Sequence, residues 1–140
     1  MSSWLTWALM SAAFAALTAI FAKVGVENVN PDVATFIRTI VVLLLLGVIV
    51  AATGQYRAVA EAPARTYVFL VLSGLATGAS WWCYFRALHL GEAARVAPID
   101  KLSVVLVAVF GVGFLGERLS VVNWLGIGMI AAGAWLVTLD

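Results

Sequence analysis

Residues 81–119 of the chain read WWCYFRALHLGEAARVAPIDKLSVVLVAVFGVGFLGERL, and most of the charges that fall inside apolar segments lie here. An aromatic, apolar helix end meets a charged turn at residues 91–95, after which Pro98 opens a second apolar run. Asp100 and Lys101 interrupt that run early, although ionisable side chains are costly to place among apolar ones. The stretch therefore contains two apolar spans together with the polar ends of both.

The whole chain has the composition of an integral membrane protein. Of its 140 residues, 64% are apolar and 11% are charged, whereas soluble domains contain about 25% charged residues to face water. The formal net charge of +1 provides no basic surface for nucleic acid. The single cysteine, Cys83, cannot form a disulfide within the chain, so we interpret it as a small core residue.

Five apolar runs are each long enough to cross a bilayer, whose hydrocarbon core of about 30 Å needs roughly 20 helical residues. They are residues 4–25, 33–53, 66–88, 97–116 and 121–139. The connections are short, and Pro31, Pro63 and Pro98 stand near the helix starts, where a missing backbone N–H is tolerated. We therefore expect an all-α integral membrane protein with five transmembrane helices, in one domain over residues 1–140 and without a soluble part.

Polar side chains follow one face of the third span. At 100° per residue, Ser73, Thr77, Ser80 and Tyr84 fall within a narrow arc, here named the hydroxyl arc, and Trp81 lies beside it. Small and hydroxyl residues allow helices to pack closely in lipid, and the same residue types line cavities. Both interpretations are open for this face. We expect a cavity lining, because the hydroxyl groups persist over several turns.

Apart from Lys23 at the end of the first span, four ionisable residues fall inside the predicted spans, and charge within a membrane indicates function by default. They are Arg38, Arg86, Asp100 and Lys101. Arg86 and Lys101 are near enough to helix ends to extend toward the interface, and Asp100 can simply neutralise Lys101 or Arg38. Arg38 lies deeper, about 9 Å beyond Asp32 at the helical rise. Arg38 is therefore the strongest single candidate, and Asp100 is its expected partner.

The basic residues do not select one orientation in the membrane. The connections on the face of the N-terminus contain Arg57, Arg65 and Arg118, three in all, and the opposite face has two, Arg95 in a connection and Lys23 at the end of the first span. The three basic residues of the spans, which lie near that opposite face, reverse the balance to three against five. Because orientation follows the imbalance of Lys and Arg, insertion in both orientations is expected. Two oppositely oriented copies would give ten helices related by a two-fold axis in the membrane plane.

Three motifs follow one another along the chain: Tyr-x-x-Ala-Leu at residues 84–88, Val-x-Pro-Ile at 96–99 and Leu-Gly-Glu-Arg-Leu at 115–119. In this order they resemble the EamA-type domain of the drug/metabolite transporter superfamily, in which an arginine also stands early in the second helix, as Arg38 does. The resemblance covers essentially the whole chain. It implies five transmembrane helices that form half of a ten-helix, inverted-repeat transporter. Most members carry two such domains in tandem, so the single domain implies pairing with itself or with a second short subunit.

The resemblance implies a multi-pass protein of the cell inner (plasma) membrane. We expect it to transport small metabolites, amino-acid-like or other organic solutes, by alternating access as an antiparallel homodimer in the lipid bilayer. The residues expected to bind the substrate are Arg38, Ser73, Thr77, Ser80, Trp81, Tyr84 and Lys101. Asp100 and Arg86 are the expected ion-pair or coupling residues.

Two other functions stay open at this point. A small multidrug-resistance-like exporter of cationic amphiphiles would use the aromatic side chains for cation–π contacts, but the basic residues inside the spans argue against it. A structural or accessory membrane subunit would use the packing faces in a larger complex. The chain contains no phosphate loop, metal-ligand cluster or nucleophile–base spacing, so we expect neither an enzyme nor a cofactor nor a bound metal. His89 is expected to be a solvated loop residue.

Overall fold

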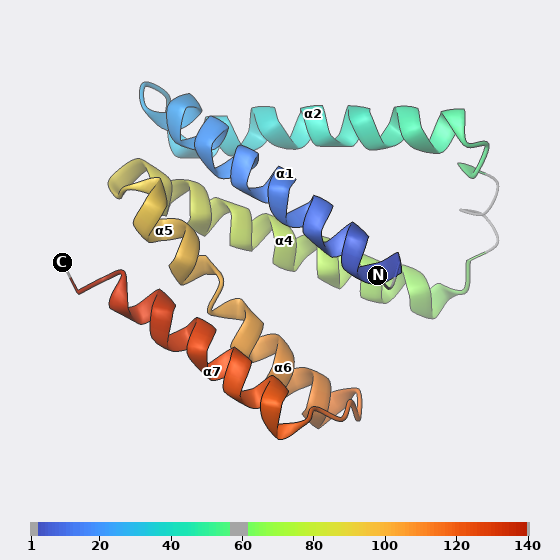
Figure 1. Ribbon diagram of the computed structural model, residues 1–140. Coiled ribbons are helices and arrows are strands. Elements are labelled where there is room, and N and C mark those ends of the chain that lie inside the picture. The colour runs from blue at the N-terminus through green and yellow to red at the C-terminus, as the bar shows by residue number, and fades with distance from the viewer. Residues whose placement is uncertain (1–2, 57–61, 140) are drawn as a thin grey trace. The chain divides into compact units, whose positions relative to one another are not determined.

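The computed structural model describes residues 3–56 and 62–139, and every regular element within them is a helix. The elements are α1 (Ser3–Val26), α2 (Pro31–Ala52), α4 (Ala64–Leu90), α5 (Ala93–Asp100), α6 (Ser103–Phe114) and α7 (Val121–Leu136) (Figure 1). The predicted all-α membrane fold is confirmed. Arg57, which entered the count of loop charges, lies outside the described residues.

Within the described residues, four segments are long and apolar enough to cross a membrane. They are Trp4–Val26, Pro31–Ala52, Ala64–Leu90 and Ala93–Phe114, the last made of α5 and α6 together. The fifth predicted span corresponds to α7, a shorter apolar helix. Most large apolar side chains are exposed in the single chain, as expected where they face lipid or another subunit rather than water.

Local contacts satisfy the polar groups that start and line α2. Asn30 precedes the helix, and its side-chain oxygen accepts a hydrogen bond from the Asp32 amide at 2.8 Å. The hydroxyl groups of Thr35 and Thr39 donate to the carbonyl groups four residues earlier, each at 2.8 Å. These bonds matter in a membrane, because an unpaired polar group in hydrocarbon has no water to bond.

The Leu-Gly-Glu-Arg-Leu motif ends α6. Gly116 has a φ of 69°, in the left-handed region that glycine adopts easily. This turn directs the Glu117 amide back to the Gly111 carbonyl at 3.0 Å, which also accepts from the Leu115 amide at 3.1 Å. The Glu117 side chain folds onto Gly111, where a Cβ would lie 2.6 Å from its Oε2. The motif therefore stops the helix, and its glutamate contacts a glycine one and a half turns earlier.

The helices group into two compact units. The hairpin unit, residues 21–90, contains the end of α1 together with α2 and α4. Helices α2 and α4 contact each other and run antiparallel (Figure 1). Its most buried side chains are Val26, Phe85 and Leu88. The split-helix unit, residues 3–20 and 91–139, contains α5 and α6, and α7 contacts both of them. Small residues, among them Ala108 and Ala134, are buried in it, and small residues allow membrane helices to approach closely.

The fourth span differs from the sequence prediction in two ways. Its helix begins at Ala93 rather than at residue 97, because the charged turn is helical: the Arg95 and Val96 amides both donate to the Glu92 carbonyl at 3.0 Å. Pro98 therefore lies inside α5 and not at its start. The helix is also interrupted after Asp100 and resumes at Ser103. A proline inside a helix removes one backbone donor and crowds the preceding turn, so Pro98 does not by itself explain an interruption that follows it.

Candidate functional site

Arg38 stands on α2 against the aromatic side chains of α4. Its guanidinium carbon lies 4.1 Å from the centre of the Trp81 ring and 5.4 Å from that of Phe85. These distances place a cation over aromatic faces, which attract it through their quadrupoles. No carboxylate of the described residues forms an ion pair with Arg38. The N–H donors of its planar guanidinium are suited to bidentate binding of a carboxylate. Within the described residues, no carboxylate occupies them.

A second cluster lies where α2 begins and α4 ends. Arg86 pairs with both carboxylate oxygens of Asp32 at 3.3 Å, and the Trp82 indole N–H donates to Asp32 Oδ1 at 2.8 Å. The Arg86 guanidinium also lies 4.4 Å from the centre of the Trp82 ring. About half of each charged side chain is exposed, 51% for Arg86 and 49% for Asp32. This cluster joins the two helices at their polar ends.

Two side chains tie the end of α1 to the end of α4. Lys23 on α1 donates to the carbonyl of Leu88 at 2.8 Å, and Nδ1 of His89 on α4 lies 2.9 Å from the carbonyl of Val26. Since a carbonyl only accepts, that imidazole nitrogen carries the proton. Basic groups at helix C-termini are favourable, because they satisfy terminal carbonyl groups and oppose the helix dipole. The prediction of a loop position for His89 is wrong, because the residue belongs to the last turn of α4; its side chain is exposed, in agreement with the predicted solvation.

A shallow depression of about 250 Å³ opens at this end of the hairpin unit. Its lining consists of Asn30, Pro31, Asp32, Arg86, His89 and Leu90. The depression is thus bordered by the ion pair and by the imidazole that holds α1. Asp32, Lys23 and Trp82 were not among the predicted site residues. Of these three, only Asp32 could have been predicted from the sequence. It stands at the start of the second span, on the same membrane face as Arg86 at the end of the third.

The hydroxyl arc lies on one face of α4. Ser73, Thr77 and Ser80 are exposed in the single chain, whereas Trp81 and Tyr84 are half-buried. The Thr77 hydroxyl donates to the Ser73 carbonyl of its own helix at 2.9 Å. Because Trp81 borders the arc and contacts Arg38, the arc and the guanidinium adjoin within one unit. Whether the arc faces a cavity stays a prediction.

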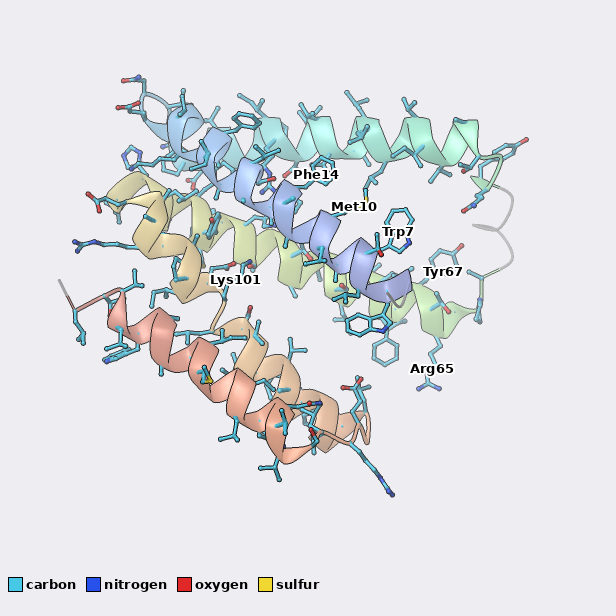
Figure 2. All side chains as sticks on the ribbon, in the orientation of Figure 1. Trp7, Met10, Phe14, Arg65, Tyr67 and Lys101 are labelled. Atoms are coloured by element: carbon cyan, nitrogen blue, oxygen red, sulfur yellow. The ribbon has the colours of Figure 1, made fainter. Side chains whose placement is uncertain are left out.

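Asp100 and Lys101 occupy the interruption of the fourth span. The Lys101 Nζ lies 3.1 Å from Asp100 Oδ2, and the two side chains are 55% and 35% exposed. Figure 2 labels Lys101, which stands between α5 and α6. Lys101 stands eight residues after the start of α5, about 12 Å along the helix. It is therefore a full turn deeper than a helix start at residue 97 would place it. Arg38 and Asp100 belong to different units, so their predicted pairing stays a prediction.

Helices of this length and apolarity, with charged residues held inside them, define a multi-pass helical membrane protein. Comparison with known proteins gives the family. Residues 2–139 match the EamA-like transporter family, and the chain belongs to that family. The resemblance drawn from the motifs is thereby confirmed.

Two curated relatives are also described as transporters. One is an "Uncharacterized transporter in cobO 3'region" of Sinorhizobium sp., 67% identical over 135 residues that make up 96% of each chain. The other is the "Uncharacterized transporter YxxF" of Bacillus subtilis, 29% identical over 95% of this chain but only 42% of the relative. No solved structure matches the chain.

Proposed function

We propose that the protein is an inner-membrane transporter of small metabolites that bear a carboxylate or another anionic group, with Arg38 as the main anion-binding residue. The observation that supports this most strongly is the stacked guanidinium of Arg38, seven residues or about 10 Å into α2. A charge at that depth is costly unless something neutralises it. A bound anionic group would supply that neutralisation and use the open donors.

Aromatic and hydroxyl groups beside Arg38 suit the rest of such a substrate. Trp81 supplies an apolar face, and the hydroxyl arc of α4 supplies weak donors and acceptors along the same side. Amino-acid-like solutes combine a carboxylate with a small polar or apolar remainder. We therefore assign Ser73, Thr77, Ser80, Trp81 and Tyr84 to the lining of the transport pathway. The Trp81 ring holds the Arg38 guanidinium close to this side of α4.

The working form in this proposal is an antiparallel homodimer. Alternating access needs two halves that rearrange about a central site, and the family domain over residues 2–139 corresponds to one such half. The Bacillus relative supports this arrangement, since the match takes up 42% of its length and leaves room for a second unit of the same size. The near balance of basic residues on the two faces of the membrane would allow one chain to supply both orientations.

The runner-up substrates are cationic amphiphiles. Residues 3–26 of α1 contain no Asp or Glu, so that helix offers no carboxylate for cations, and Arg38 already covers Trp81 with a positive charge. A like-charged pathway lowers the local concentration of cations. Both observations favour anionic groups.

Uptake by purified protein in liposomes tests the proposal. The probes are radiolabelled L-leucine, L-lactate and tetraphenylphosphonium. We expect saturable uptake of at least one carboxylate probe and none of the cation. Preferential uptake of tetraphenylphosphonium would overturn the substrate class. Failure to move any probe would favour an accessory membrane subunit over a transporter.

A further inference from the structure

The depression at the polar end of the hairpin unit presents groups of both charges. Its lining includes one carboxylate, Asp32, one guanidinium, Arg86, and one imidazole, His89. About half of each of the two charged side chains is exposed. With the imidazole neutral, these three groups carry no net charge. A ligand of the depression therefore meets a polar surface that offers both a positive and a negative group.

The ion pair in the depression leaves much of its hydrogen-bonding capacity open. One nitrogen of Arg86, Nη2, makes both contacts to the Asp32 carboxylate at 3.3 Å, whereas charge-assisted hydrogen bonds usually measure about 2.7–2.9 Å. Within the described residues, the Nε and Nη1 groups of Arg86 donate no hydrogen bond, and Asp32 Oδ2 accepts only the long contact from Nη2. An anionic group can therefore bind Arg86, and a cationic donor can bind Asp32, while the two residues stay side by side.

His89 adds an acceptor to this surface, and Trp82 fixes the two charges. The Nδ1–H of His89 donates to the Val26 carbonyl, so the Nε2 of the neutral ring is an acceptor. Among the described residues, nothing bonds to that nitrogen. The Trp82 indole N–H donates to Asp32 Oδ1 at 2.8 Å, and its ring centre lies 4.4 Å from the Arg86 guanidinium. One rigid side chain thus positions the carboxylate and the guanidinium together.

This end of the hairpin unit lies at the level of the lipid head groups. α4 has 27 residues and is therefore about 40 Å long. The hydrocarbon core is about 30 Å thick, and the head-group regions bring the bilayer to about 40–45 Å. The last turn of α4, and the start of α2 that pairs with it, consequently reach the head-group region. A tryptophan that is 47% exposed, as Trp82 is, is typical of this interface.

We infer that the depression binds the head group of phosphatidylethanolamine, in which a short ethylene bridge joins a phosphate to a primary ammonium group. The phosphate accepts from the open N–H groups of Arg86, and the ammonium group donates to Asp32 and to Nε2 of His89. The head group has no net charge, like the lining. Phosphatidylcholine has no N–H to donate, and phosphatidylglycerol brings a negative charge to Asp32 without an ammonium group. The inference does not depend on the proposed function.

A lipid suits this depression better than a free solute does. Its volume of about 250 Å³ is below the range of about 300–1,000 Å³ for pockets that enclose a whole small molecule. A shallow site of that size can hold a head group while the acyl chains stay in the bilayer. Leu90, an apolar side chain that is 86% exposed, borders the polar groups. It offers the lipid an apolar contact next to its head group.

Thermal melting of the purified protein in dodecyl maltoside tests this binding without a transport assay. Dioleoyl lipids with ethanolamine, choline or glycerol head groups are added separately, so that only the head group differs. Phosphatidylethanolamine should stabilise the wild type at about ten-fold lower concentration than phosphatidylcholine, the effect of one charge-assisted hydrogen bond. Equal stabilisation by these two lipids, or stronger stabilisation by phosphatidylglycerol, overturns the inference. Soluble O-phosphoethanolamine should stabilise less than the lipid, and an equal effect would overturn the assignment to a lipid.

Two variants locate the effect at the depression. Asp32→Asn removes the partner of the ammonium group, and Arg86→Gln removes that of the phosphate, so each should lose most of the preference for phosphatidylethanolamine. Arg65→Gln is the matched control, because it removes an arginine stacked on Phe69 at the other end of α4, and it should keep the preference. An Asp32→Asn protein with the full preference places the lipid elsewhere and overturns the inference. The comparison of lipids on the wild type decides the matter even if a variant does not fold.

Discussion

Replacing Trp81 by leucine isolates the contribution of the ring beneath Arg38. The guanidinium carbon lies 4.1 Å from the ring centre, well inside the range of about 6 Å over which cation–π attraction acts. Such contacts are worth about 0.5–1 kcal/mol when exposed and about 2 kcal/mol when desolvated. Arg38 is half-buried, so a loss of about 1–2 kcal/mol is expected. At about 1.4 kcal/mol for each factor of ten, substrate affinity should fall about 5- to 30-fold.

The measurement is the concentration dependence of uptake in proteoliposomes for whichever carboxylate probe the wild type transports. Trp81→Phe retains an aromatic face and should lose less affinity than Trp81→Leu. Trp82→Leu serves as the comparison, because it removes the ring under Arg86 and the hydrogen bond to Asp32 instead. That variant should lower thermal stability more than affinity. Normal half-saturation in a folded Trp81→Leu protein would refute the role given to the stacked guanidinium.

Three further predictions concern topology, the ion pair at the helix ends, and the end of α6. Reporters fused to the C-terminus should be active on both sides of the membrane. Two lysines added to the 54–65 connection should leave one orientation and stop transport unless an oppositely biased copy is co-expressed. A single orientation in every context would contradict the antiparallel pair. Asp32→Asn keeps an acceptor for Trp82 but loses the charge facing Arg86. Because the Asp32–Arg86 pair is half exposed, the free energy of unfolding, measured by thermal melting, should fall by no more than about 1 kcal/mol. A Cβ at position 113 meets open space, so Gly113→Ala should raise the free energy of unfolding by up to about 1 kcal/mol through helix propensity. Gly111→Ala must displace the Glu117 carboxylate and should raise it less. Equal melting temperatures of the two variants would show that the Glu117 contact contributes nothing.

Sequence reasoning reached the membrane fold because span length and apolarity are local properties. The first three spans matched observed helices within a few residues for that reason. The fourth did not, since the charges of Glu92 and Arg95 indicate a loop in a hydropathy pattern, whereas in the structure they pair across the first turn of α5. The interruption after Asp100 was also missed. It depends on whether amides bond three or four residues back, and composition does not record that.

Contacts between helices were harder to predict than positions along them. Arg38 was selected as a deep charge, but its neighbour Trp81 was assigned only from its place beside the hydroxyl arc. The pairing of Asp32 with Arg86 requires knowing that α2 and α4 are antiparallel neighbours. The bond from His89 to α1 requires the same kind of knowledge for two helix ends. Each of these contacts is set by packing between segments far apart in the sequence, which no periodicity within one helix reveals.

Arg38 provides the most direct test of an anion-binding transporter. Wild type, Arg38→Gln and Arg38→Lys are compared in proteoliposomes for uptake of the carboxylate probe, with Arg65→Gln as the matched control. Arg65 also stacks on an aromatic ring, Phe69 at 5.7 Å, but stands at the start of α4. We predict that Arg38→Gln abolishes uptake, that Arg38→Lys retains part of it because the charge remains without the planar fork, and that Arg65→Gln transports normally. Folded Arg38→Gln protein that transports at the wild-type rate would contradict anion binding at Arg38.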